Sequence, residues 1–175
     1  MLRKGFIVAA LAALFSLPTA SKAAVENPYE LTLGGGASNG PDFNGFSASV
    51  NGSIGYYFTE SLEVGLRQSV TYTDVNTTGG QLSGSTRVAL DLHFPLGDKG
   101  QIVPFVGANI GYVYGDAVND TFEAAPEAGV KLYLNSNTFV FILAEYQFFF
   151  DHANEASDSF SNGSFVYTMG LGFRF

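Results

Sequence analysis

Cysteine and tryptophan are both missing from this sequence of 175 residues, and basic residues are scarce. Without cysteine the chain has no disulfide framework, no thiolate metal site and no cysteine nucleophile. Eight Lys and Arg stand against sixteen Asp and Glu, and the resulting net charge of −8 argues against nucleic acid as a partner. Charged residues make up only 14% of the chain, against about a quarter in ordinary globular proteins.

The first 23 residues read as a signal peptide. Arg3 and Lys4 form a basic start, an apolar run follows over 6–17, and Pro18 ends it. The run is too short to cross a bilayer as a helix, and the small residues Ser21 and Ala23 suit a cleavage site after position 23. The alternative is a buried N-terminal helix. We expect residues 1–23 to be removed and residues 24–175 to form the mature domain.

The rest of the chain alternates with a period of two and shows no helical period. Runs of alternating residues are separated by Pro or by clusters of Gly, Asn, Asp and Ser, which favour turns. Eight strands are predicted, at 28–37, 46–58, 62–73, 82–94, 102–114, 122–134, 138–150 and 164–175. Short links alternate with longer ones near 38–45, 74–81, 115–121 and 151–163.

The two faces of these strands differ in composition. In the second strand Ala48, Val50 and Ile54 share one face, while Ser49 and Asn51 share the other. A soluble barrel or sandwich would turn the apolar face inward, whereas an outer-membrane barrel would turn it toward lipid. The polar face is rich in Gly, Ser, Asn and Thr and poor in Lys and Glu, and aromatic residues gather near strand ends. Both features favour an all-β, eight-stranded antiparallel up-and-down transmembrane β-barrel with both termini in the periplasm.

Two strands contain irregular residues. The strand at 138–150 is apolar on both faces, so with Val140 and Ile142 outward a second apolar set should pack inside the barrel. This inward set is Phe139, Phe141, Leu143 and Phe149. Pro126 cannot donate to a ladder, so a bulge or the loop-side end of pairing is expected there.

Residues 24–175 resemble the small eight-stranded outer-membrane barrels, the OmpA/OmpX-like group that includes the opacity-like proteins. The most specific match is the last strand, with Thr168, Gly170, Phe173 and Phe175. In that group such an ending is an assembly signal, so the resemblance implies recognition by the barrel-assembly machinery. Simple lipid-facing alternation also accounts for the two phenylalanines. OmpA-type proteins continue into a peptidoglycan-binding domain, and we expect no such tether here.

Candidates for catalysis are few. Barrels of this group that modify lipid A need a histidine with a serine or acidic partner near the outer leaflet. His93 is predicted to lie at the periplasmic end of its strand, and His152 follows Asp151 in an acidic loop. The arrangement is more typical of a solvated loop than of an active site. We expect no enzymatic activity, no cofactor and no metal site.

A polar network is predicted in the lumen, made of Arg67, Arg87, Glu127, Glu145, Asp91 and Lys131. The two arginines lie on adjacent strands, as do Glu127 and Glu145, and all four fall at a similar height. Charges in so narrow an interior should pair across it. A second layer is predicted nearer the periplasm, with Glu30, Glu63, Asp91, His93, Lys131 and Arg174. A structural plug is favoured over a gate for small ions.

The predicted long loops carry acidic residues and no Lys or Arg. The set is Asp42, Asp74, Asp116, Asp120, Glu123, Asp151, Glu155 and Asp158. A solvated rim is the simplest interpretation, and divalent cations bridging to lipopolysaccharide are the alternative. We expect a monomeric integral outer-membrane protein with a structural or surface-interaction role, surrounded by lipid and lipopolysaccharide. A narrow pore for small solutes or ions and a surface adhesin are the alternatives.

Overall fold

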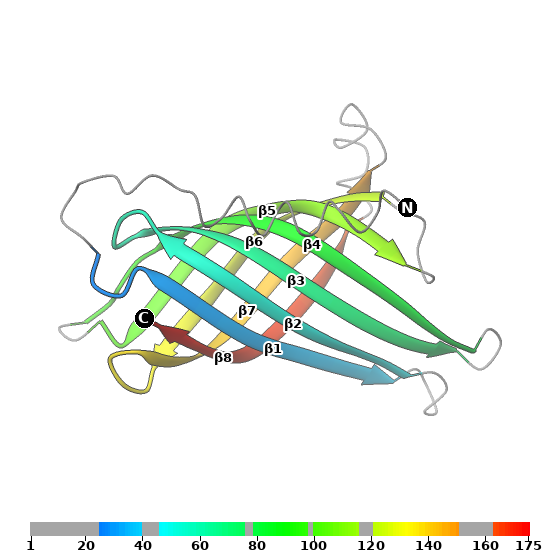
Figure 1. Ribbon diagram of the computed structural model, residues 1–175, viewed down its shortest axis with the longest axis horizontal. Helices are drawn as coiled ribbons and strands as arrows, with labels where there is room; N and C mark the ends of the chain where they lie inside the picture. The colour runs from blue at the N-terminus through cyan, green and yellow to red at the C-terminus, as the bar shows by residue number, and fades with distance from the viewer. Residues whose placement is uncertain (1–24, 40–45, 76–78, 98–99, 116–120, 151–162) are drawn as a thin grey trace.

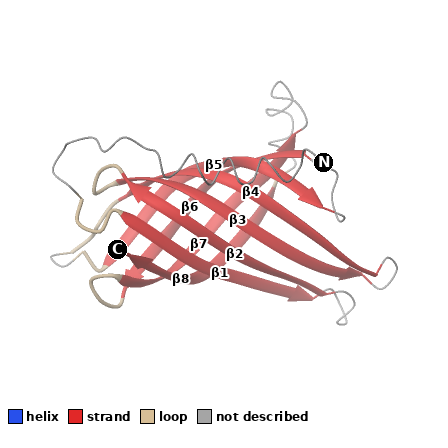
Figure 2. Cartoon of the chain, viewed as in Figure 1, coloured by secondary structure: helices blue, strands red, loops and turns tan. Residues whose placement is uncertain are grey.

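The chain forms a closed barrel in which every strand is antiparallel to its neighbours (Figure 1; Figure 2). The computed structural model describes residues 25–39, 46–75, 79–97, 100–115, 121–150 and 163–175. The strands are β1 Tyr29–Asn39, β2 Phe46–Tyr57, β3 Leu62–Val75, β4 Gly79–His93, β5 Ile102–Gly115, β6 Thr121–Tyr133, β7 Thr138–Phe150 and β8 Ser164–Arg174. The predictions of an all-β fold and of eight antiparallel strands are confirmed.

Strands adjacent in sequence are paired in space, and β1 pairs with β8 to close the barrel. The largest difference from the predicted bounds is at the third hairpin. The β3–β4 ladder continues to the pair Val75–Gly79, and Gly79 takes a positive φ of 73°. Glycine adopts this conformation without strain, so the two strands extend farther than their alternation alone indicates. The part of the chain that the structure describes has no helix long and apolar enough to cross a membrane.

Pro126 lies within β6, and the predicted bulge or end of pairing is wrong. On one side of β6 the ladder with β5 runs through the pair Ala108–Pro126. On the other side Ala124 pairs with Phe148 and Glu127 with Glu145, which is the same register before and after the proline. The missing N–H interrupts the ladder with β7 locally but requires no extra residue.

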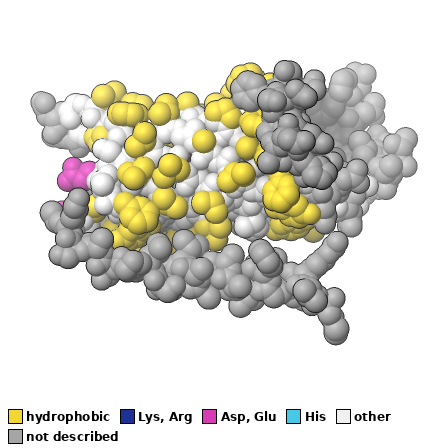
Figure 3. Space-filling view, turned by 90° about the horizontal axis from the view of Figure 1, so that it is seen from above, with side chains coloured by type: hydrophobic (Ala, Val, Ile, Leu, Met, Phe, Trp, Pro, Cys, Tyr) yellow, Lys and Arg dark blue, Asp and Glu magenta, His cyan; other side chains and the backbone are white. Residues whose placement is uncertain are grey.

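Large apolar side chains are exposed on the outside of the barrel, and Figure 3 shows them spread over one face. Leu33 is 64% exposed, Val88 51% and Ile110 55%, and each lies inside a strand rather than at its tip. Aromatic contacts occur at both strand ends, with Tyr29 against Phe175 at one end and Tyr112 against Phe122 at the other. The outward apolar face predicted from the alternation is therefore observed.

A small apolar cluster fills the lumen near the short turns. It contains Phe105, Phe139, Phe141 and Leu143, with Tyr133 packed against it. The last β7 member of the predicted inward set, Phe149, lies opposite the inward residue Glu123, but it is 46% exposed, so its predicted packing inside the lumen is not observed. The ladder between β7 and β8 ends at the pair Gln147–Ser164, so no described β8 residue pairs with Phe149.

Candidate functional site

The register places like charges directly opposite one another on the inner wall. Arg67 of β3 pairs with Arg87 of β4, and Glu127 of β6 pairs with Glu145 of β7. Directly opposed like charges destabilise a sheet. The favourable partners of each pair therefore have to come from across the lumen.

Arg67 is the centre of these cross-lumen contacts. Its Nη1 and Nη2 each donate to a different carboxylate oxygen of Glu127 at 2.7 Å, which is a two-point ion pair. Nη2 also donates to Asp91 Oδ2 at 2.7 Å. Paired hydrogen bonds of this kind between a guanidinium and a carboxylate are among the stronger polar contacts in proteins.

Arg87 binds the other glutamate. Its Nη1 lies 2.6 Å from Glu145 Oε1, and its Nε lies 3.5 Å from Glu123 Oε1. Asn109 joins the two ion pairs, because its Nδ2 donates to Glu127 Oε2 at 2.5 Å and to Glu145 Oε1 at 2.8 Å. We call this set the mid-lumen cluster: Arg67, Arg87, Asp91, Asn109, Glu123, Glu127 and Glu145.

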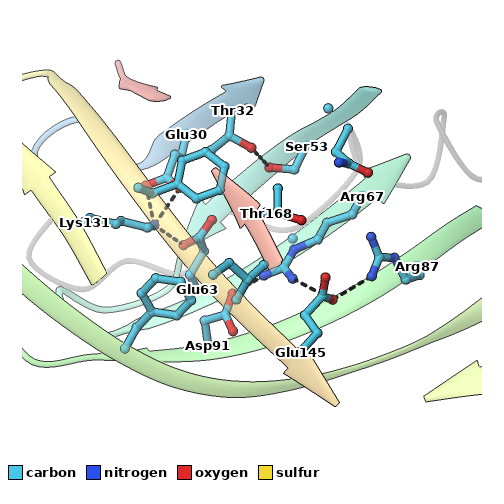
Figure 4. Close-up of a pocket in the computed structure, with 16 residues that line it drawn as sticks. Glu30, Thr32, Ser53, Glu63, Arg67, Arg87, Asp91, Lys131, Glu145 and Thr168 are labelled. Carbon is cyan, nitrogen blue, oxygen red and sulfur yellow. Dashed lines mark hydrogen bonds and ion pairs between the residues drawn. The ribbon is translucent and has the colours of Figure 1, made fainter. Parts of the chain in front are cut away.

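A second cluster lies around Lys131, which is almost fully buried (Figure 4). Lys131 Nζ lies 2.6 Å from Glu30 Oε1 and 3.0 Å from Glu63 Oε2, and it donates to the Tyr57 hydroxyl at 2.9 Å. The Tyr57 hydroxyl donates in turn to Glu30 Oε2 at 2.9 Å. We call this set the turn-end cluster: Glu30, Tyr57, Glu63, His93, Lys131 and Arg174.

The other members of the turn-end cluster close it toward the short turns. His93 Nε2 lies 3.4 Å from Glu63 Oε2, and its ring packs between those of Tyr57 and Phe105. The Arg174 guanidinium lies 4.0 Å from the centre of the Tyr57 ring. This histidine is thus packed within the lumen, and His152 falls outside the described residues.

The structure brings Arg67, Arg87, Glu127 and Glu145 together, and it places Lys131 with Glu30 and Glu63. Asp91, however, binds Arg67 and so belongs to the mid-lumen cluster rather than to the second layer where it was predicted. Its register partner on β3 is the like-charged Glu63. The carboxylate therefore gains by reaching toward the arginine four residues farther along that strand.

Three residues of the clusters were missed or misplaced. Tyr57 and Asn109 share the inward parity of Gly55 and Gly107, so the alternation places both in the lumen, although neither was predicted as a member of the network. Glu123 was assigned to an acidic loop but lies in β6 with only 3% of its surface exposed. Most of the predicted rim lies outside the described residues: Asp42, Asp116, Asp120, Asp151, Glu155 and Asp158.

Little free space remains inside the barrel. A cavity of about 50 Å³ lies between the clusters, lined by residues that include Glu63, Arg67, Asp91 and Glu145 (Figure 4). A water molecule needs roughly 10–15 Å³ on this measure, so the cavity has room for a few waters. No group of three or more His, Cys, Asp or Glu in the described ranges has an arrangement that suits a metal ion.

The residues of the predicted assembly signal divide between the two faces of β8. Thr168 is buried on the lumen side, while Phe173 and Phe175 are 49% and 56% exposed on the outside. The backbone of Phe175 exchanges hydrogen bonds with Tyr29 at 2.9 and 3.0 Å, and the two rings stack with centres 5.9 Å apart. Phe175 thus takes part in closing the barrel. The predicted signal peptide lies outside the described residues.

Solved structures of other proteins share this fold, and two of them illustrate the likeness. The N-terminal β-barrel domain of Pseudomonas aeruginosa OprF matches with a TM-score of 0.56 and 20% sequence identity, over 86% of this chain and 98% of that one. The outer membrane protein OprG from Pseudomonas aeruginosa matches with a TM-score of 0.58 and 13% identity, over 84% of this chain and 95% of that one. Comparison of the sequence with protein-family models and with curated proteins found no match. At these identities the likeness concerns the fold.

Proposed function

We propose that this protein is an integral barrel of the outer membrane, held there by its apolar outer surface and closed to solutes by its charged lumen. Its role is structural or one of surface interaction, and we assign it no catalytic step. Monomeric insertion with both termini in the periplasm, and with lipid and lipopolysaccharide as its surroundings, is part of the proposal.

The observation that carries the proposal is the inversion of polarity between the inside and the outside. Large apolar side chains such as Leu33 and Ile110 are more than half exposed, while Glu30, Lys131 and Glu145 are almost fully buried. In water such an arrangement leaves the hydrophobic surface unsatisfied and the charges costly. In a bilayer the apolar belt faces hydrocarbon, and closure of the barrel satisfies the strand edges. The shared fold with OprG, an outer membrane protein, supports the same location.

The packing of the lumen favours a closed barrel over the alternative of a narrow pore. The Arg67–Glu127 and Arg87–Glu145 ion pairs cross the interior at mid-height, and the cavity beside them holds about 50 Å³. An eight-stranded barrel has an interior only wide enough for side chains to fill. A solute larger than a few waters would have to displace buried ion pairs to pass.

A charge placed on the outer surface tests whether that surface faces lipid. Val88 is 51% exposed near the middle of β4, and Leu134, one residue past the end of β6, is 65% exposed. In a bilayer Val88→Arg should lower the free energy of unfolding by about 2–4 kcal/mol, and Leu134→Arg by about 0–1 kcal/mol. Denaturant titrations of barrels inserted in lipid vesicles measure both values. A water-soluble barrel would tolerate both changes equally, and that result would contradict the proposal.

A further inference from the structure

Asp91 lies between two other acidic residues on the inner wall of the barrel. On one side it pairs with Glu63 of β3. On the other side it pairs with Gly107 of β5, and Gly107 pairs in turn with Glu127 of β6. The three acidic residues are buried, with between 4 and 6% of their surface exposed. Like charges side by side in a sheet are unfavourable, and burial increases the cost.

Arg67 is the cation that Asp91 and Glu127 share. Its Nη2 donates to Glu127 Oε1 and to Asp91 Oδ2, both at 2.7 Å. The other guanidinium of the mid-lumen cluster, that of Arg87, lies 2.6 Å from Glu145 and so has a different partner. One positive charge therefore stands against two carboxyl groups at this place.

The two carboxyl groups differ in the hydrogen bonds that they accept. Glu127 accepts two from Arg67 and one from Asn109. Asp91 accepts one from Arg67 through Oδ2, while its Oδ1 is buried and no described residue donates to it. Hydrogen bonds from donors stabilise the ionised form of a carboxyl group. Glu127 thus has the surroundings of a carboxylate, and Asp91 has those of a neutral acid.

The free oxygen of Asp91 is directed toward Glu127. A Cβ atom built on Gly107 would collide with Asp91 Oδ1, so this oxygen lies over the glycine that separates the two acidic residues. The side chains of Asp91 and Glu127 are within hydrogen-bonding reach of one another. An ionised carboxylate has no donor, so two carboxyl groups can form a hydrogen bond only if one of them carries a proton. Figure 4 shows Asp91 beside the cavity with Arg67 and Glu63.

We infer that Asp91 is a neutral carboxylic acid in the folded barrel, and that Asp91 and Glu127 together form a proton-binding site. On folding, Asp91 Oδ1 takes up one proton from the solvent and donates it to the Glu127 carboxylate. Asp91 Oδ2 still accepts from Arg67, which is then opposed by one negative charge instead of two. The site lies inside the barrel, so the inference does not depend on what surrounds the outer surface.

Other titratable groups near Asp91 have to be separated from it in any test. Those that face it or its cavity are Glu63, Arg67, His93, Glu127, Lys131 and Glu145. Asp91→Asn leaves all of them in place. The amide also reproduces both contacts of the neutral acid, because its Oδ1 can accept from Arg67 and its Nδ2 can donate to Glu127.

Infrared spectroscopy detects a neutral acid directly, because the carbonyl stretch of a protonated carboxyl group is separate from the bands of carboxylates. The barrel folded in detergent micelles suffices, since the site is internal. At neutral pH the wild-type protein should show this band, and Asp91→Asn should lose the intensity of one carboxyl group. Asp74→Asn is the matched control, because Asp74 lies near the loop end of β3, opposite Phe46. That variant should keep the band.

The pH dependence of unfolding provides the second measurement. An aspartate in the unfolded chain is ionised above about pH 5, so the folded wild type would hold one proton more than the unfolded chain. Such a folded state becomes less stable as the pH rises. From about pH 5.5 to about pH 7.5, the unfolding equilibrium constant of the wild type relative to Asp91→Asn should rise about tenfold per pH unit. The contributions of Glu63 and His93 are common to both proteins and cancel in this ratio.

Four results would overturn the inference. Absence of the acid band from the wild type, or its full retention in Asp91→Asn, would mean that Asp91 is ionised. A ratio of unfolding constants that does not change with pH would mean the same. Failure of Asp91→Asn to fold would mean that the charge of Asp91 is required. Stability that follows the sodium concentration instead of the pH would mean that a metal cation, rather than a proton, balances the two carboxylates.

Discussion

Arg67 has three acidic side chains within ion-pair distance: Asp91, Glu127 and Glu145. A guanidinium suits this position because its planar array of donors can bind several oxygens at once, which an ammonium on a flexible chain cannot do with the same geometry. These side chains are buried, so each charge depends on its partner. A carboxylate that loses its partner stays desolvated, which is costly. The value of such a pair is therefore seen when one half is removed.

Removal of either partner of the Arg67–Glu127 pair should destabilise the barrel. Arg67→Met and Glu127→Gln should each cost about 3–5 kcal/mol, because each leaves buried polar groups without their partner. The double variant should recover part of the loss, with a coupling energy of about 0.5–3 kcal/mol. Equilibrium unfolding in lipid vesicles measures all three values. The control is the double variant Arg67→Met with Glu30→Gln, because these two residues belong to different clusters. The losses in its free energy of unfolding should be additive.

The hydroxyl of Tyr57 links Lys131 to Glu30, and its removal should be measurable. Tyr57→Phe should cost about 1–3 kcal/mol, because it leaves two buried charged groups with one hydrogen bond fewer. Tyr56→Phe is the control, since that side chain lies on the outer face and packs against Tyr29 and Phe58. Its effect should stay within about 0.5 kcal/mol. Equal losses in the two variants would contradict a structural role for the Tyr57 hydroxyl.

At the scale of the strands, large inward side chains face glycines on the neighbouring strand. Phe139 pairs with Gly172, Phe105 with Gly129, and Asp91 with Gly107. In each case a Cβ on the glycine would collide with the side chain of its partner. The glycines on the polar face thus make space for rings and charged groups to lie against the wall of a narrow barrel.

A methyl group on one of these glycines should disturb the packing. Gly172→Ala places the new Cβ against the ring of Phe139, which is fully buried, and should cost about 1–3 kcal/mol. Gly52→Ala is the matched control, because the nearest atom to its Cβ is the Thr32 carbonyl oxygen at 3.8 Å. This variant should be neutral or slightly stabilising. Similar costs at both positions would mean that strand propensity, rather than space for Phe139, is what the glycine provides.

At the scale of the whole molecule, Phe175 takes part in closing the barrel and is also the last residue of the predicted assembly signal. Phe175→Ala should lower the stability of the purified barrel by about 1 kcal/mol through loss of the stacked contact with Tyr29. If the last strand is also an assembly signal, the amount of protein in the outer membrane should fall several-fold more than this loss explains. Phe58→Ala is the control, because that ring is similarly exposed and packs against Tyr56. A parallel fall in both variants would contradict a recognition role.

Conductance distinguishes a closed barrel from a pore. In planar bilayers the wild-type protein should be nearly silent, because buried ion pairs cross the lumen and little space remains beside them. Arg67→Ala removes the contacts to Glu127 and Asp91 and should produce brief openings that prefer cations, since the remaining charges are mostly acidic. Frequent openings of the wild-type protein would favour the pore.

Alternation in the sequence was enough to predict the barrel and most of its inner wall. A period of two assigns each residue to one face, so Arg67, Glu127 and Lys131 could be placed in the lumen without coordinates. The predicted ends of the strands were less accurate where glycine and other turn residues lie inside a strand, as at Gly79. Glu123 was misplaced because it lies next to a predicted loop, where an acidic residue is expected to be solvated. Its position in the alternation of the strand would have assigned it to the lumen.

By itself, the sequence determined the number of strands, the face on which each side chain lies and the excess of acidic over basic groups. The tertiary structure decided which charges meet, because contacts across a lumen depend on the stagger of all eight strands. Thus Asp91 binds Arg67 rather than joining Lys131, and each inward phenylalanine meets its glycine. It also decided where the β1–β8 ladder ends, since closure brings together the two strands that are farthest apart in the chain.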